Sequence, residues 1–210
     1  MKKLVVKDNR KKLPKEFRND DNRFLESLVR YFLNKYTIKG DKIFDPFAGL
    51  GTTLIVSEKM QRIPYGIEID ERRYDYIKTN IKHKKNIILG NSLELQKNKF
   101  PNFDFSITSP PYNPIDEENY LSGKGGYKGF IKDLGKIYSQ LKKFMKKDAI
   151  IVIESANLKG KRITPLPRDI KREISKIFKF EDEIIVDLKT KSPKSNCEYV
   201  ISSCLIFKNS

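Results

Sequence analysis

Hydrophobic and polar residues alternate along the chain with two different periods, which predicts helices and strands that follow one another. Apolar residues recur every three to four positions over 25–33 and 130–144, as expected for helices with one buried face. Short apolar runs with polar boundaries are typical of buried strands. We predict strands at 43–45, 63–69, 86–89, 103–107, 149–153, 184–188 and 199–207, and helices at 21–36, 52–60, 71–83, 130–144 and 170–177.

The order of these elements predicts the fold class. Strands that alternate with helices form a parallel sheet with helices on both of its faces, so we expect an α/β fold. The last two strands have no helix between them, which predicts a hairpin with one antiparallel strand. No linker or repeat divides the chain, so residues 22–210 are expected to form one domain, preceded by a basic extension, residues 1–21, that forms a loop or docks on the domain.

Composition narrows the function classes. The chain has 43 Lys and Arg against 27 Asp and Glu, a formal net charge of +16. This excess either binds nucleic acid or reflects a Lys-rich composition. Two cysteines and the single His83 exclude a disulfide framework and a zinc site by spacing, so no metal is expected. No apolar stretch is long enough to span a bilayer and no signal peptide is present, so we expect a cytoplasmic protein without membrane contact.

The first strand leads into a glycine turn that resembles a ligand cradle. The turn reads DPFAGLGTT, residues 45–53. Gly49 and Gly51 allow a sharp bend and the close approach of a ligand. Thr52 and Thr53 begin the next helix, where unpaired N–H groups favour a carboxylate or phosphate. Asp45 ends the strand and can hold a cationic amine.

Two further strand ends complete a pocket for an adenosine with an amino-acid tail. Glu68 follows the second strand and can accept hydrogen bonds from both hydroxyls of a ribose. Asn91 and Ser92 follow the third strand, within reach of an adenine edge. Ligands of open α/β sheets bind at this carboxyl edge.

The fourth strand ends in Ser109, Pro110, Pro111 and Tyr112. Two successive prolines remove two N–H donors and leave backbone carbonyls as acceptors. The Ser109 side chain and the Pro110 carbonyl can therefore hold both hydrogens of an exocyclic amine. Tyr112 can stack on the base that carries this amine, once the base has left the duplex.

These motifs resemble those of the S-adenosylmethionine-dependent amino-methyltransferases that modify DNA at N4 of cytosine or N6 of adenine. The resemblance rests on DPFAGLGTT (45–53), GIEID (66–70), GNS (90–92) and TSPPYN (108–113), in that order. It implies a Rossmann-like, mostly parallel sheet of seven strands with a C-terminal antiparallel hairpin and helices on both faces. It also implies S-adenosylmethionine as cofactor and duplex DNA with a flipped base as substrate.

The resemblance assigns roles by position. Residues Asp45, Phe47, Gly49, Gly51 and Thr52 would line the methionine end of the cofactor, Glu68 its ribose, and 109–112 would form the catalytic loop. The usual Asp of the third motif is Asn91 here, which can still accept one hydrogen bond. Ser at position 109 is similar to the N4-cytosine branch, which makes a DNA (cytosine-N4)-methyltransferase the first hypothesis.

Other hypotheses remain open: N6-adenine as target, an RNA base as target, and a basic module that binds nucleic acid without catalysis. The loops that could read a DNA sequence are short, which favours a short site or a recognition or restriction partner subunit. Basic residues in or beside these loops are predicted to contact nucleic acid, namely Lys124, Lys128, Lys161, Arg162, Arg168 and Lys191.

Overall fold

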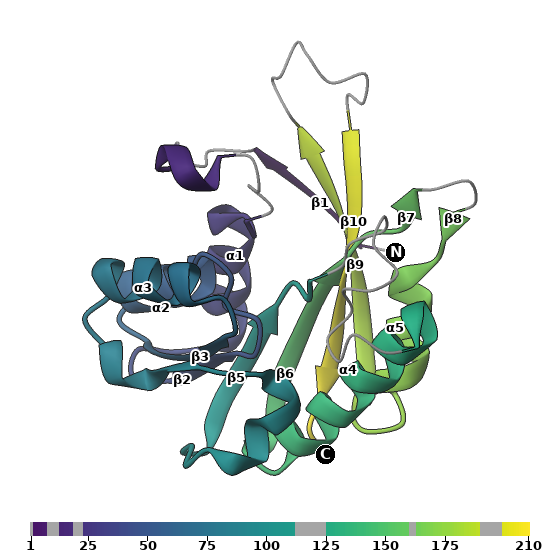
Figure 1. The fold of residues 1–210 in the computed structure, drawn as a ribbon. Coiled ribbons are helices and arrows are strands. Elements are labelled where there is room, and N and C mark those ends of the chain that lie inside the picture. The colour runs from purple at the N-terminus through teal and green to yellow at the C-terminus, as the bar shows by residue number, and fades with distance from the viewer. Residues whose placement is uncertain (1, 8–12, 19–22, 112–124, 160–162, 190–198) are drawn as a thin grey trace.

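A mostly parallel sheet lies between two groups of helices, and two short strands form a separate small sheet (Figure 1). The computed structural model describes residues 2–7, 13–18, 23–111, 125–159, 163–189 and 199–210. The strands are β1 (Lys2–Lys7), β2 (Lys42–Asp45), β3 (Ile63–Glu68), β4 (Ile87–Leu89), β5 (Phe103–Thr108), β6 (Met145–Ser155), β7 (Leu158–Lys159), β8 (Ile163–Thr164), β9 (Lys179–Lys189) and β10 (Tyr199–Lys208). The α-helices are α1 (Glu26–Tyr36), α2 (Thr52–Lys59), α3 (Glu71–Asn80), α4 (Gly126–Lys142) and α5 (Leu166–Ile174), and three short 3₁₀ helices are η1 (Lys15–Phe17), η2 (Lys84–Asn86) and η3 (Ser92–Lys97).

The main sheet has the order β1-β9-β10-β6-β5-β2-β3-β4. Among its strands, β10 alone pairs antiparallel with its neighbours β6 and β9, which confirms the predicted hairpin. The strand order reverses between β2 and β5, because the chain builds β3 and β4 on one side of β2 and the later strands on the other. In open α/β sheets such a switch point is where ligands bind.

The sheet has eight strands, one more than the predicted seven. The additional strand is β1, which pairs parallel with β9 at the edge of the sheet, with Lys2 opposite Ile184. Its sequence KKLVVK is too short and too basic to predict a strand, and its partner lies about 180 residues further along the chain. Val6 is buried against the α1 side of the sheet, whereas Val5 on the opposite face is 50% exposed.

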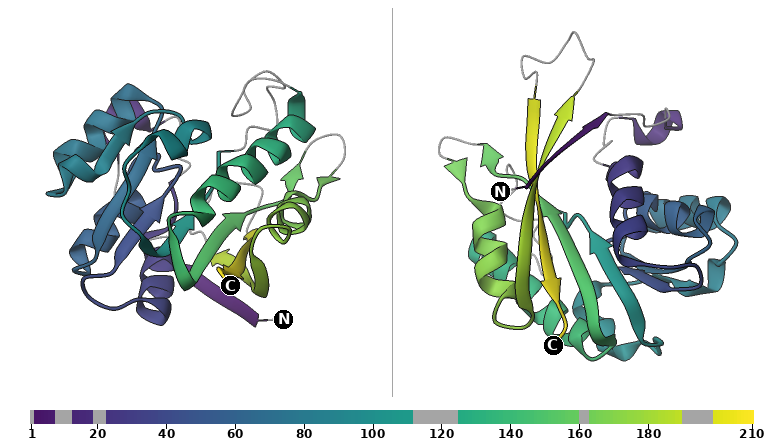
Figure 2. Two further views of the ribbon diagram at one scale, coloured as in Figure 1. Left: turned by 90° about the horizontal axis from the view of Figure 1, so that it is seen from below. Right: turned by 180° about the vertical axis from the view of Figure 1, so that it is seen from behind.

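Both faces of the central strands are buried, so they consist of nearly continuous apolar runs. Helices α1, α2 and α3 lie on one face and α4 and α5 on the other (Figures 1 and 2). Successive residues of β6 point to opposite faces of the sheet. Ile151 and Ile153 pack in the hydrophobic cluster with α4 and α5, and Val152 packs in the cluster with α1. No helix among the described residues is long and apolar enough to cross a membrane.

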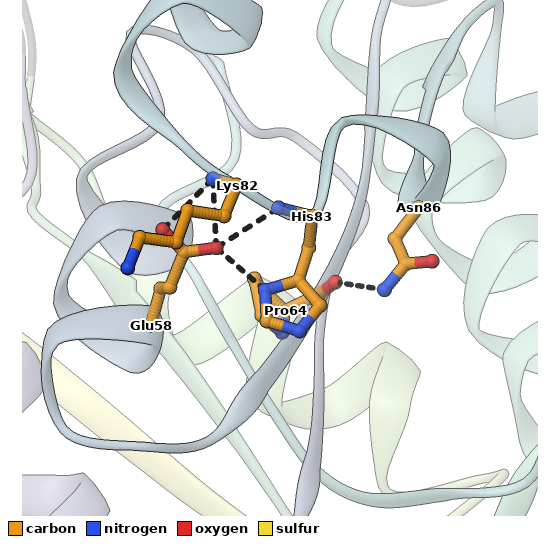
Figure 3. A network of polar contacts seen from close by, with 5 residues as sticks. All are labelled: Glu58, Pro64, Lys82, His83 and Asn86. Carbon is orange, nitrogen blue, oxygen red and sulfur yellow. Dashed lines mark hydrogen bonds and ion pairs between the residues drawn. The ribbon is translucent and has the colours of Figure 1, made fainter.

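A polar network fixes the connection between α3 and β4 (Figure 3). The Glu58 carboxylate accepts hydrogen bonds from the backbone N–H groups of Lys82 and His83, and its Oε1 lies 2.5 Å from His83 Nδ1. Burial alone would raise the pKa of Glu58, but these hydrogen bonds outweigh it and lower the pKa. Helix α3 ends at Asn80, so His83 lies beyond the helix that we predicted to reach it, and its role here is structural.

Candidate active site

Four strand ends bring the candidate residues to one edge of the sheet. Strands β2, β3, β4 and β5 are parallel neighbours, so their carboxyl ends face the same side. Asp45 ends β2, Glu68 ends β3, Asn91 lies two residues after β4 and Ser109 directly follows β5. The glycine turn and the Ser-Pro-Pro segment therefore begin on adjacent strands, β2 and β5, on either side of the switch point.

A hydrogen bond joins these two segments directly. The Thr108 hydroxyl at the end of β5 donates to Asp45 Oδ1 at the end of β2, over 2.5 Å. The same carboxylate oxygen accepts the backbone N–H of Phe47 at 2.9 Å, which holds the turn against the strand. Asp45 is 3% exposed, and this burial raises the pKa of its carboxyl, although the hydrogen bonds act in the opposite direction.

The two glycines of the turn are required for different reasons. Gly49 has a φ of +56°, and a Cβ there would meet only the Phe47 carbonyl oxygen, at 4.0 Å, so the backbone is left-handed and open to a ligand. Gly51 has a φ of +76°, and a Cβ there would lie 2.9 Å from Ile77 Cγ1 of α3. Gly51 therefore permits the close packing of α2 on α3, whereas Gly49 leaves free space above the turn.

Three other residues of this motif lie around the turn. Thr52 is the first residue of α2, after Gly51 as N-cap, and is partly exposed. Thr53 is 1% exposed, so its side chain faces the protein interior. Phe47 is partly buried and packs on the core cluster beneath α4.

Glu68 supports the glycine turn from the neighbouring strand. Its Oε2 accepts the backbone N–H of Gly49 at 2.6 Å, and its Oε1 accepts that of Asp70 at 2.9 Å. The residue is 6% exposed, and burial raises the pKa of its carboxyl. Each carboxylate oxygen can accept a second hydrogen bond. The geometry thus combines a structural link to Gly49 with remaining capacity for a ligand hydroxyl.

The residues after β4 are largely engaged within the protein. Asn91 is the N-cap of η3, and its Oδ1 accepts the backbone N–H of Leu93 at 2.9 Å. This bond uses one lone pair of the oxygen, so the oxygen can accept one more hydrogen bond and the side-chain NH₂ can donate to a ligand. The Ser92 hydroxyl, which is 5% exposed, donates to the Pro46 carbonyl oxygen and so links η3 to the glycine turn.

Ser109 is joined to a carboxylate on the next strand. Its hydroxyl donates to Glu154 Oε2 at 2.7 Å, from the end of β5 to the end of β6. Pro110 is buried and Pro111 is exposed, so the segment leaves the sheet between these two residues. Tyr112, the last residue of the predicted catalytic loop, lies outside the described residues.

Three residues of this edge were missing from the sequence prediction. Ile69 and Leu89 are 66% and 43% exposed; Ile69 directly follows Glu68, and Leu89 lies opposite Glu68 in the register of β3 and β4. Glu154 directly follows the buried run of β6, as Asp45 and Glu68 follow theirs. The same rule that found those two acids, a carboxylate at the end of a buried parallel strand, would have found Glu154.

The predicted nucleic-acid contacts are only partly described. Lys128 is exposed near the start of α4, and Arg168 is exposed near the start of α5. The two helix starts are joined by a hydrogen bond from the Tyr127 hydroxyl to Asp169 Oδ2, at 2.9 Å. Lys124, Lys161, Arg162 and Lys191 lie outside the described residues. No group of three metal-ligating side chains occurs among the residues that the structure describes.

Comparison with known proteins supports one family. Residues 5–79 match the family model described as DNA methylase. This match covers about a third of the chain, including the motifs from β2 and β3, and ends before β5. No curated protein sequence matches the chain.

The fold is that of solved methyltransferase structures. TrmN from Thermus thermophilus aligns with a TM-score of 0.65 at 15% identity, covering 88% of this chain and 49% of TrmN, so the chain spans about half the length of that protein. A putative RNA methyltransferase from Pyrococcus horikoshii aligns with a TM-score of 0.57 at 15% identity, covering 87% and 82%. Magnesium protoporphyrin IX methyltransferase from Synechocystis, solved with bound SAM, aligns with a TM-score of 0.57 at 14% identity, covering 88% and 77%.

These comparisons establish the Rossmann-like methyltransferase fold that the motifs implied. Identities of 14–15% establish the fold alone. Together with the DNA methylase match, the fold supports methyl transfer and S-adenosylmethionine as the cofactor.

Proposed function

We propose that this protein is an S-adenosylmethionine-dependent methyltransferase that acts on an exocyclic amine of a nucleic-acid base, with N4 of cytosine in DNA as the first candidate. The observation that carries the proposal is the hydrogen bond between Thr108 and Asp45. It links the candidate cofactor turn to the segment that would hold the amine. Donor and acceptor of the methyl group would then meet at the carboxyl ends of the neighbouring strands β2 and β5.

The chemistry of the edge fits this cofactor. Its sulfonium and ammonium groups are cationic, and the buried carboxyls of Asp45 and Glu68 are sites where a cation is favoured. The space above Gly49 admits a ligand close to the backbone. Exposed Ile69 and Leu89 offer an apolar surface to the adenine, and the NH₂ group of Asn91 can donate to a ring nitrogen. When bound, the cofactor supplies an electrophilic methyl group on sulfur.

The residues of the chain would orient and polarise the amine. The Ser109 hydroxyl donates to Glu154, so its oxygen lone pairs are available to accept one amine hydrogen. The Pro110 carbonyl oxygen would accept the other. Holding both hydrogens makes the nitrogen more pyramidal and aims its lone pair at the methyl group. Orientation of this kind supplies much of the rate enhancement in group transfer.

The proposal also names the base that is methylated and the nucleic acid that contains it. Ser at position 109 favours cytosine through the similarity to the N4-cytosine branch, with N6 of adenine as the alternative target. The likeness of the fold to a putative RNA methyltransferase supports RNA as a second candidate substrate. Single-stranded RNA presents bases that are already unstacked, so no separate recognition domain is needed. For duplex DNA, a partner subunit could supply sequence recognition, and Lys128 and Arg168 could contact phosphates.

Methyl transfer from labelled cofactor to duplex plasmid DNA and, separately, to bulk RNA tests the proposal. Mass spectrometry of the digested nucleosides then identifies the methylated base. The proposal predicts N4-methylcytosine in DNA. N6-methyladenine in DNA, or a methylated amine in RNA, would contradict cytosine in DNA as the target and assign the target to that base and polymer. If the protein does not bind the cofactor and transfers no methyl group to either polymer, the result would instead favour a non-catalytic module that binds nucleic acid.

The Ser109→Ala variant tests the role of the amine site. We expect turnover to fall while cofactor affinity stays nearly unchanged, because Ser109 acts on the amine. Ser139→Ala is the matched control, since the Ser139 hydroxyl donates within α4, to the Gly135 carbonyl, and turnover should be retained. Equal losses of turnover and cofactor affinity in Ser109→Ala would contradict the assigned role.

A further inference from the structure

Glu154 occupies the end of β6, one strand further from the cofactor turn than Ser109. Strand β6 pairs parallel with β5 and antiparallel with β10, where Glu154 lies opposite Cys204. The carboxylate is partly buried, and its Oε2 accepts the Ser109 hydroxyl hydrogen at 2.7 Å. A second hydroxyl, that of Ser202 on β10, also hydrogen-bonds to this carboxylate.

No Lys or Arg forms an ion pair with Glu154 within the described part of the chain. Of the titratable groups, the Cys204 thiol is close enough for the carboxylate to raise its pKa, and burial is the larger cause of that rise. Burial likewise raises the pKa of Glu154, and the two serine hydroxyls act against it. A carboxylate bound by two hydroxyls is placed to orient those hydroxyls rather than to pair with a cation.

We propose that Glu154 is a positioning residue that orients the Ser109 hydroxyl toward the amine of the substrate; this inference rests on the proposed function. A serine hydroxyl has one hydrogen and two lone pairs, and rotation about its C–O bond can present either to the site. Because Glu154 takes the hydrogen, both lone pairs of Ser109 Oγ face away from β6 and are free to accept an amine hydrogen. A hydrogen bond to a carboxylate is also stronger than one to a neutral acceptor, so the orientation is held firmly.

The kinetic test uses Glu154→Ala, Glu154→Gln and the double variant with Ser109→Ala, on the nucleic acid that the wild-type protein methylates. We expect Glu154→Ala to lower kcat by roughly 100-fold with unchanged cofactor Kd, as a lost orientation of the reacting groups does. Glu154→Gln keeps one acceptor oxygen and should recover part of this loss. Because Glu154 acts through Ser109, Glu154→Ala should add little to Ser109→Ala. Additive losses in the double variant would overturn the proposal.

A second test needs neither cofactor nor turnover. The carboxyl carbon of Glu154 is titrated by ¹³C NMR in the protein alone, in the wild type and in Ser109→Ala. Loss of a hydroxyl that stabilises the ionised form should raise the pKa of Glu154. Ser203→Ala is the matched control, since the Ser203 hydroxyl, next along β10, donates to Glu183 Oε1 at 2.8 Å and should leave this pKa unchanged.

The two tests separate the failure of this inference from the failure of the proposed function. An unchanged pKa of Glu154 in Ser109→Ala would overturn the inference whether or not the protein is active. An inactive wild-type protein with the expected pKa change would overturn the proposed function and leave the link between Ser109 and Glu154 in place. Thermal unfolding of each variant shows whether lost activity comes from lost folding.

Discussion

Replacing Gly51 by Ala tests the packing of the glycine turn on α3. The variant residue would keep a φ of +76°, and a left-handed backbone costs a residue with a side chain about 1–2 kcal/mol. Its Cβ would also lie 2.9 Å from Ile77 Cγ1, and because Ile77 is fully buried it has little room to move. Overpacking of this kind costs about 1–3 kcal/mol. We expect Gly51→Ala to lower the free energy of unfolding by about 2–5 kcal/mol in total.

Gly40→Ala is the matched control, because it isolates the backbone term. Gly40 has a φ of +87° with no atom within 4 Å of an added Cβ, and it lies before β2, at the opposite edge of the sheet from the candidate site. Its loss should be only about 1–2 kcal/mol. Urea unfolding of both variants at one pH gives the two free energies, provided that the slopes agree. A Gly51→Ala variant no less stable than Gly40→Ala would refute the packing argument.

Two further predictions concern cofactor binding. Ile69→Asn should weaken S-adenosylmethionine binding about fivefold, or about 1 kcal/mol, since part of the apolar contact with the adenine is lost. The control is Ile38→Asn, at a similarly exposed residue before β2, which should leave the Kd measured by calorimetry unchanged. Equal effects of the two substitutions would contradict the adenine site. Burial raises the pKa of Asp45 and Glu68. A cationic group of the cofactor at Asp45 and its ribose hydroxyls at Glu68 would both stabilise the ionised carboxylates, so cofactor affinity should rise with pH through these raised pKa values and level off above them. Calorimetry in buffers of different ionisation enthalpy should then show proton release on binding below the plateau, and an affinity that falls with rising pH would contradict the role of these carboxyls.

The sequence predicted those parts of the site that depend on one strand and the turn after it. Asp45, Glu68 and Ser109 each follow an apolar run, so their place at the carboxyl edge follows from the parallel sheet alone. The amphipathic pattern of α4 likewise predicted its buried face, including Leu134 and Leu141.

Features that depend on contacts between distant segments could not be predicted. Strand β1 exists because β9 offers an edge, and no local pattern in KKLVVK indicates that partner. Arg62 is 8% exposed and donates hydrogen bonds to the carbonyls of Leu33 and Thr37 at the end of α1 and to that of Met60 at the end of α2. A lone arginine in the sequence carries no such signal. The hydrogen bond that the Gly49 N–H donates to Glu68 depends on the geometry of a turn 19 residues earlier in the chain than Glu68.

The central claim is that the ends of β2, β3 and β5 form one site for a methyl donor and an amine. A crystal structure of the protein with S-adenosylhomocysteine, the demethylated cofactor, tests this most directly. The account predicts the ribose at Glu68, the adenine against Ile69, and the sulfur between the Gly49 turn and Ser109. A ligand bound elsewhere, or one whose sulfur is separated from Ser109 by the body of the sheet, would contradict it.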